Sequence, residues 1–115
     1  MAIRHWRILI MRFIETPIFT RALNRFVGDE EYRALQIALM LRPEQGPVIV
    51  GTHGARKLRW ARPGAGKRGG LRLIYYWDQA RATFYMLYVY AKSEQGELTP
   101  SQARLLGRLI REEFT

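Results

Sequence analysis

Positively charged side chains gather in one stretch of the sequence, from Arg56 to Arg72. Seven Lys or Arg residues fall within it, and no Asp or Glu occurs between Glu44 and Asp78. Lys and Arg donate charge-assisted hydrogen bonds to phosphate oxygens, and Arg can donate two in parallel. The ordinary alternative is a solvated charged face, but so clear a positive field favours a nucleic-acid footprint. We therefore predict that this stretch forms an RNA-phosphate-binding surface.

Basic and aromatic side chains in and beyond this stretch could together hold phosphate and bases. Arg72 is the most informative, because it interrupts an apolar strand, where a charge is costly unless it reaches a groove or a partner. Aromatic rings can stack on unpaired bases. Core packing is preferred for Tyr75, whereas Tyr88 and Tyr90 fit packing and base contact equally well. The full set is Lys57, Arg59, Lys67, Arg68, Arg72 and Lys92, with Tyr75, Tyr88 and Tyr90.

Other motifs point to no cofactor. Residues 64–69 fit G-x-G-x-x-G, but a strand follows them where dinucleotide binding needs a helix, and the P-loop spacing is absent. The two histidines and the scattered carboxylates lack metal-ligand spacing, so no metal is expected. His53 is a candidate general base beside the basic strand, although a turn-exposed histidine without a chemical role is the favoured interpretation.

Composition fits a single domain with a sizeable core. The chain has 115 residues, 48% of them hydrophobic, and a formal net charge of +9 that favours nucleic acid, an anionic membrane surface or an acidic protein as partner. The absence of cysteine excludes disulfide and thiolate chemistry. Arg7 and Arg12 interrupt the apolar amino terminus, which therefore does not resemble a signal peptide, and no apolar stretch is long enough for a bilayer. A cytoplasmic location is the simplest expectation.

The strands that must position the basic residues follow from apolar runs and alternation. In the strand at 56–61, Leu58 and Trp60 share the inner face while Lys57 and Arg59 share the outer one. The strand at 71–77 carries Arg72. Strands are predicted at residues 8–14, 48–50, 56–61, 71–77 and 84–90.

Capping signals mark three helices. Thr16 is the predicted N-cap of the first, which has Pro17 at its first position and ends at Gly28. Asp29 is the predicted cap of the second, which closes at Pro43 and forms a helical hairpin with the first. A capping box beginning at Thr99 starts the last helix. The order β-α-α-β-β-β-β-α indicates one α+β domain over residues 1–115.

Four segments of the chain carry a family resemblance: DEEYR at 29–33, GTHGARKLR at 51–59, GKRGGLRLIYY at 66–76 and YAKSE at 90–94. Together they resemble the RelE/HigB superfamily of type II toxin–antitoxin toxins, most of all its HigB-type branch. The resemblance runs from about Phe13 onward. Residues 1–10 fall outside it as an extension, and Met11 is an alternative start.

The resemblance implies a RelE-like small antiparallel sheet with an N-terminal helical hairpin and a C-terminal helix. It implies a metal-independent, ribosome-dependent endoribonuclease that enters the ribosomal A site and cuts mRNA. In that reaction a ribose 2′-hydroxyl attacks the adjacent phosphate, leaving a cyclic phosphate and a 5′-hydroxyl. The site must deprotonate the nucleophile, stabilise the anionic phosphate and protonate the leaving oxygen.

The family's site residues carry over by position. Arg72 matches the strand arginine that stabilises the phosphate, Lys57 and Arg59 match a basic pair that positions RNA and helps proton transfer, and Lys92 is the further catalytic member. The residues expected to bind RNA are Arg56, Lys67, Arg68 and Tyr90.

The sequence departs from the archetypal pattern after its last strand. Ser93 stands where that pattern has an arginine, and no tyrosine follows Tyr90. The general acid and base therefore stay open among Lys92, Tyr90, Glu94 and His53.

The same resemblance implies a partner, a HigA-like helix-turn-helix antitoxin. Its acidic or apolar segment would cover the basic face or a helix groove, and operator DNA would be reached only through it. Two other functions remain in view: a ParE-like gyrase inhibitor with the same fold, and an RNA-binding module without catalysis. The basic residues argue against the first, because a protein inhibitor has no need of phosphate ligands.

Overall fold

A computed structural model describes residues 10–61 and 70–114, and this part of the chain contains four strands, three α-helices and a terminal π-helical turn. The strands form one sheet in the order β1-β4-β3-β2. The elements are β1 (Arg12–Glu15), α1 (Pro17–Phe26), α2 (Asp29–Leu41), β2 (Arg56–Trp60), β3 (Leu71–Asp78), β4 (Thr83–Ala91), α3 (Pro100–Leu109) and the π-helical turn (Ile110–Phe114).

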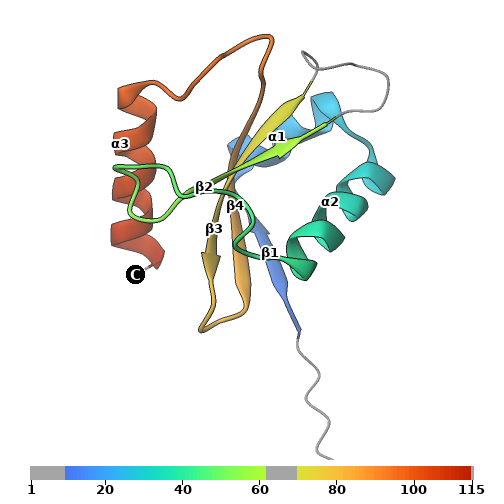
Figure 1. Cartoon of the computed structure of the whole chain (residues 1–115), viewed down its shortest axis with the longest axis horizontal. Coiled ribbons are helices and arrows are strands. Elements are labelled where there is room, and N and C mark those ends of the chain that lie inside the picture. The colour runs from blue at the N-terminus through green and yellow to red at the C-terminus, as the bar shows by residue number, and fades with distance from the viewer. Residues whose placement is uncertain (1–9, 62–69, 115) are drawn as a thin grey trace, which may run out of the picture.

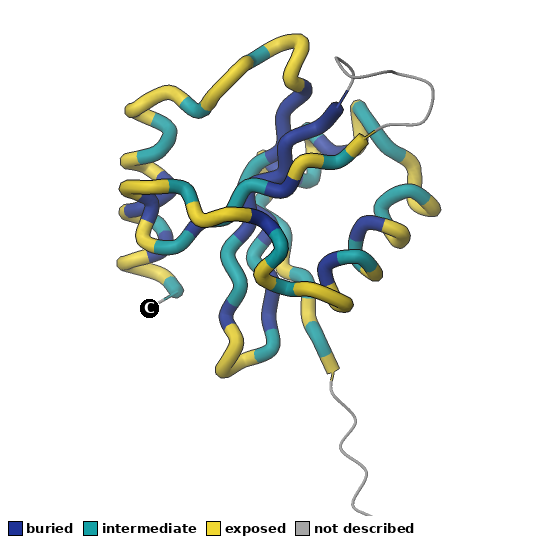
Figure 2. The backbone as a smooth tube through the Cα atoms, viewed as in Figure 1, coloured by how far each residue is buried: buried dark blue, intermediate teal, exposed yellow. Residues whose placement is uncertain are grey.

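Helices cover both faces of the sheet (Figure 1). On one face α1 and α2 bury an apolar cluster around Phe19, Leu35 and Tyr75. On the other face Leu106 of α3 and Ile110 of the π-helical turn pack against the sheet. The buried positions concentrate in β3 and β4, the two central strands (Figure 2). Each fully buried side chain of this size contributes about 1.5–3 kcal/mol, so the two clusters hold the sheet between its helices.

The predicted fold class is confirmed: an α+β domain with two N-terminal helices, a small sheet and a C-terminal helix. The strands β2, β3 and β4 are antiparallel, as predicted. The short β1 instead pairs parallel to β4, which makes the sheet mixed. This direction is open to β1 because two helices, rather than a tight hairpin, follow it in the chain.

A β-bulge interrupts the pairing of β3 with β4. Ile74 pairs with Tyr88 and the next residue, Tyr75, pairs with Met86, so Leu87 has no partner across the strands. Beyond the bulge the alternation of β4 changes phase. Tyr88 consequently lies on the same face as its partner Ile74, which is the α3 face.

Thr16 joins the bulge to the start of α1. Its hydroxyl accepts a hydrogen bond from the backbone N–H of Phe19 at 3.1 Å, as an N-cap does. The same hydroxyl donates to the carbonyl of Leu87 at 2.8 Å, and the backbone N–H of Thr16 donates to Met86 at 3.0 Å. The first helix is thus attached to β4 where its pairing is irregular.

The helix predictions hold at two of three starts. Thr16 caps α1, and the capping box of Thr99 with Gln102 opens α3. The prediction that Asp29 caps the second helix is wrong. Gly28 is the N-cap and makes no side-chain hydrogen bond, and Asp29 is the first residue of α2. In the first turn its carboxylate still interacts favourably with the helix dipole.

Two predicted strands changed. The opening strand predicted at 8–14 is β1, Arg12–Glu15, and residues 8–9 lie outside the described part. The strand predicted at 48–50 is reduced to one isolated bridge, from Val48 to Arg56. The chain turns immediately afterwards, at Gly51 and His53, whose positive φ angles end any extended pairing.

Replacing Thr16 by Ala should test this attachment. The substitution removes both the α1 cap and the donor to Leu87, so we expect the free energy of unfolding to fall by about 1–2 kcal/mol in urea denaturation. Thr16→Ser keeps the hydroxyl and should lose clearly less. Equal losses in the two variants would assign the effect to the methyl group and contradict the capping account.

Candidate nucleic-acid interface

Strand register brings the basic residues of β2 and β3 together on the α3 face of the sheet. Arg59 pairs with Arg72, and Arg72 pairs with Tyr90 on β4. Lys57 lies in the next row of this face, which continues through Ile74 to Tyr88. Directly opposed residues in antiparallel strands point to the same side. We call this set the basic face: Lys57, Arg59, Arg72, Tyr88 and Tyr90.

Arg72 lies at the centre of the basic face and is only 9% exposed. Within the described residues, its guanidinium makes one hydrogen bond, from Nη1 to the carbonyl of Leu71 at 3.3 Å. The guanidinium also lies close to Gly70, where an added Cβ would be 3.1 Å from Nη1. The residue directly opposite, Arg59, carries the same charge. Two adjacent positive charges, one of them buried, favour the binding of an anion between them.

Tyr90 offers an unused hydrogen-bond donor beside Arg72. The residue is 4% exposed, and its buried hydroxyl oxygen has no hydrogen-bond partner among the described residues. Burial raises the pKa of the phenol, and the charge of Glu97 raises it further, while Arg72 and Arg59 act in the opposite direction. The hydroxyl therefore stays protonated, and a bound phosphate oxygen could accept its hydrogen bond.

The other two tyrosines differ from Tyr90 in their contacts. Tyr88 is half-buried, its ring centroid 5.7 Å from that of Tyr90, and its hydroxyl lies 3.4 Å from the side-chain oxygen of Gln95. Tyr75 belongs to the core on the opposite face, as predicted. Its hydroxyl donates to the carbonyl of Pro43 at 2.7 Å and accepts from the N–H of Gly46 at 3.1 Å.

Lys57 forms an ion pair with a residue that the sequence reasoning missed. The Nζ atom of Lys57 lies 3.2 Å from Oε2 of Glu97, which follows β4 in the segment leading to α3. The side chain of Lys57 is 18% exposed and that of Glu97 is 79% exposed. A single glutamate after a glycine has no spacing that marks it, so only the folded chain reveals the pair.

Two predicted site residues, Arg56 and His53, lie away from the basic face, and a third, Glu94, lies at its edge in a pocket that Tyr88 and Tyr90 also line. Arg56 belongs to the opposite parity of β2, and its Nη1 atom donates to the backbone carbonyls of Glu44 at 3.0 Å and Gly46 at 2.9 Å. The ring of His53 lies against α3, where a Cβ on Gly107 would be 3.3 Å from its Cδ2 atom. Glu94 pairs with Arg25 of α1 at 3.4 Å. None of these contacts involves the basic face.

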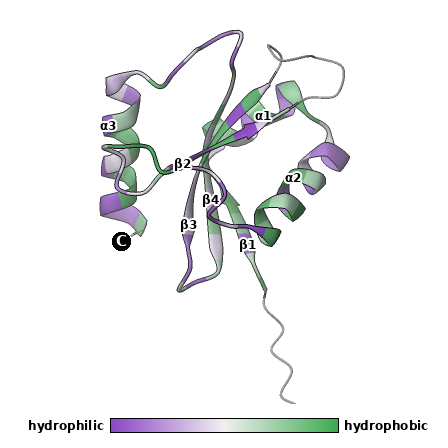
Figure 3. Ribbon diagram, viewed as in Figure 1, coloured by the Kyte–Doolittle hydropathy of each residue, from purple (hydrophilic) through white to green (hydrophobic). Residues whose placement is uncertain are grey.

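Lys92 follows the end of β4 and is exposed. Its backbone N–H donates to the carbonyl of Gly70 at 3.1 Å, which places its backbone beside the start of β3, two residues from Arg72. Lys67 and Arg68 lie outside the described residues. Figure 3 shows hydrophilic colour along β2, whereas α3 carries both hydrophobic and hydrophilic colour.

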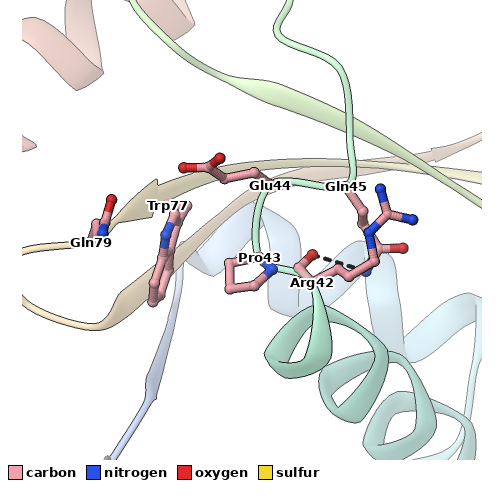
Figure 4. Close-up of a pocket in the computed structure, with 6 residues that line it drawn as sticks. All are labelled: Arg42, Pro43, Glu44, Gln45, Trp77 and Gln79. Atoms are coloured by element: carbon pink, nitrogen blue, oxygen red, sulfur yellow. Dashed lines mark hydrogen bonds between the residues drawn. The ribbon is translucent and has the colours of Figure 1, made fainter.

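A pocket of about 560 Å³ at the end of α2 lacks the concentration of positive charge found on the basic face (Figure 4). Its walls carry charges of both signs, on Arg42 and Glu44, and Gln45 hydrogen-bonds to the carbonyl of Arg42. Trp77 lines it and packs against the α1–α2 core, and none of its lining residues belongs to the basic face. Among residues 10–61 and 70–114, no group of three metal-ligating side chains comes together.

A second concavity, of about 490 Å³, is an apolar groove between α1 and α3. Ile18 of α1 is 51% exposed at its rim and Leu105 of α3 is 63% exposed. No helix of the described part is long and apolar enough to cross a membrane. The lining residues are Thr16, Ile18, Leu87, Tyr88, Gln102, Leu105, Leu106 and Leu109.

No protein-family model matches the sequence. Two solved structures are similar to the fold. One is the E. coli toxin RelE in the free state, a mutant with two arginines replaced by alanine: 16% identity, TM-score 0.53, covering 83% of this chain and 95% of that one. The other is the intact E. coli RelBE toxin–antitoxin complex: 15% identity, TM-score 0.51, covering 70% of this chain and 94% of that one. The fold is therefore RelE-like.

Two tyrosine-to-phenylalanine variants should separate a structural hydroxyl from an unused one. Tyr75→Phe leaves Pro43 and Gly46 without their buried partner and should cost about 1–3 kcal/mol of unfolding free energy. Tyr90→Phe removes a hydroxyl that has no partner, so we expect a change within about 0.5 kcal/mol, or a gain. Urea denaturation of both variants measures this. A loss for Tyr90→Phe as large as that for Tyr75→Phe would contradict the free hydroxyl.

Proposed function

We propose that this protein is the toxin of a type II toxin–antitoxin system, of the HigB-type branch, and that it cleaves mRNA on the ribosome. The observation that carries the proposal is the basic face: two opposed arginines beside an unpartnered tyrosine hydroxyl, on a RelE-like fold. The four segments of family resemblance support the same reading. A surface of this kind fits a phosphate that gains negative charge during a reaction.

The proposed reaction is an intramolecular transesterification at phosphorus. The ribose 2′-oxygen attacks the adjacent phosphorus, the bond to the 5′-oxygen breaks, and a cyclic phosphate and a 5′-hydroxyl remain. Arg72 would stabilise the charge on the non-bridging oxygens, with Arg59 beside it. Lys57 would position the strand, and the hydroxyl of Tyr90 would donate to the phosphate. No metal is required for these roles.

The wider RNA surface is part of the proposal. Lys92, at the end of the ladder that carries Arg72, would contact the next phosphate, and Lys67 and Arg68 would bind RNA backbone. Arg56 contributes less than its position in the sequence suggested, because its guanidinium is bound to two backbone carbonyls.

Arg72→Ala should abolish most cleavage. We expect the cleavage rate on mRNA in a purified translation reaction to fall by about 10²–10³-fold, because the developing charge loses its buried donor. Primer extension maps the cuts. Arg104→Ala removes one exposed charge from α3 and should behave as the wild type. Thermal unfolding of Arg72→Ala should show an intact fold, since no acid among the described residues pairs with Arg72.

Other outcomes would replace the proposal. Intact message with unaffected translation in the wild-type reaction would exclude the nuclease. RNA binding that weakens steeply with salt, without cleavage on ribosomes, would indicate a non-catalytic module. Inhibition of gyrase supercoiling would indicate a ParE-like function.

We also propose that a helix-turn-helix antitoxin binds this protein, with an apolar, acidic segment in the groove between α1 and α3. The RelBE structure with a similar fold is a toxin–antitoxin complex. The groove exposes Ile18 and Leu105, and Arg21 and Arg108 lie one helical turn from them. Apolar anchors with basic neighbours suit an amphipathic acidic segment. The chain's net charge of +9 favours such a partner as well.

Leu105→Asp should weaken this complex. Placing a carboxylate in the apolar groove should reduce the affinity for the antitoxin encoded beside this protein by about 2 kcal/mol or more, roughly thirtyfold. Calorimetric titration measures the affinity. The matched control is Leu41→Asp, which changes an exposed leucine of α2 outside the groove. Equal affinities for the two variants would remove the groove as the binding surface.

A further inference from the structure

The proposed cleavage needs a base for the 2′-hydroxyl, and in the described part of the chain neither Glu94 nor His53 contacts a cation of the basic face. The carboxylate of Glu94 pairs with Arg25 of α1, and the ring of His53 lies against Gly107 of α3. The pKa of Tyr90 is raised by its burial, so its phenol is held in the protonated form. A proton donor such as Tyr90 cannot serve as the acceptor in the same state.

Glu97 brings a carboxylate to the basic face. Its Oε2 atom lies 3.2 Å from Nζ of Lys57, and this is the one ion pair that a residue of the basic face makes within the described part of the chain. The charge of Glu97 also contributes to the raised pKa of Tyr90, which is consistent with its approach from the β4 side. Lys57 is largely buried in the pair, whereas the carboxylate remains open to a ligand.

The turn that carries Glu97 is attached to the start of α3. The side-chain amide of Gln95 donates to the carbonyl of Glu97 at 2.9 Å and also to Oε1 of Gln102. Gln102 in turn accepts from the N–H of Thr99 at 2.9 Å as half of the capping box. The backbone of Glu97 is therefore tied to the start of α3, and Lys57 is the contact of its carboxylate.

We propose, on the basis of the function proposed above, that Glu97 is the general base of the cleavage reaction. Its carboxylate takes the proton of the ribose 2′-hydroxyl while the 2′-oxygen forms its bond to phosphorus. The bond between phosphorus and the 5′-oxygen breaks, and its electron pair leaves with that oxygen. The 5′-oxygen takes a proton from the Tyr90 hydroxyl. Exchange with water afterwards returns a proton to Tyr90 and removes one from Glu97.

Lys57 has a supporting part in this step. Its ammonium holds the carboxylate at 3.2 Å. Lys57 itself lies in the row of Ile74 and Tyr88, next to the row of Arg59, Arg72 and Tyr90. The groups shown to interact with Glu97 are Lys57 of β2, at 3.2 Å, and Tyr90 of β4, whose pKa its charge raises.

Glu97→Gln tests the assignment in full-length protein on programmed ribosomes. The amide keeps the size of the side chain but cannot accept the proton, so kcat should fall by about a hundredfold or more. KM should stay the same or decrease, because a negative charge leaves the RNA-binding face. The wild-type rate should decline toward acid pH as the base is protonated, and the variant should lose that limb. Glu97→Asp should recover part of the rate.

Glu112→Gln is the matched control, since it removes one exposed carboxylate from the C-terminal turn, and it should cut at the wild-type rate. A wild-type rate for Glu97→Gln would overturn the inference while leaving the nuclease intact. A faster rate would also overturn it, because the carboxylate would then compete with RNA for Lys57. Absence of cleavage by the wild type would overturn the proposed function and this inference with it.

Discussion

The arrangement of this molecule follows from one electrostatic constraint, the burial of the Arg72 guanidinium in a central strand. A charge in that place needs a partner, and the described chain supplies a second arginine opposite it where an acid would satisfy it. No acid among residues 10–61 and 70–114 pairs with it, so the site favours an anion supplied by a ligand. The fold carries this local cost because its stability comes from elsewhere, in the apolar cluster under α1 and α2.

The two faces of the sheet consequently have different tasks. On the α1–α2 face the polar atom of the central tyrosine, Tyr75, is fully used by Pro43 and Gly46. On the α3 face the helix covers only part of the surface, and the rest presents charge and an unused hydroxyl. The same strands serve both tasks because alternation separates their side chains. A packed core thus lies directly behind the surface proposed to bind a phosphate that gains negative charge during the reaction.

Much of the fold could be predicted from local patterns. The caps at Thr16 and Thr99, the alternation of β2 and the isolated charge at Arg72 are each properties of a few neighbouring residues. Other relations need the folded chain. Arg56 shares the parity of Leu58 and Trp60, which β2 itself reveals, but its bonds to the carbonyls of Glu44 and Gly46 appear only in the structure. Glu97 reaches Lys57 across 40 positions of sequence, so composition identified the basic stretch but not all the residues that converge on it.

The bulge at Leu87 determines which side chains of β4 belong to the basic face. Along a regular strand, even-numbered side chains point to one face of the sheet and odd-numbered side chains to the other. The extra residue shifts this alternation, so Tyr88 and Tyr90 lie on the same face as Arg72 while Met86 lies in the α1–α2 cluster. Deleting one residue here would leave composition and hydrophobicity nearly unchanged. It would nevertheless exchange the faces to which the side chains on one side of the deletion point. An insertion or deletion in β4 could thus let a closely similar chain keep its fold and lose the basic face.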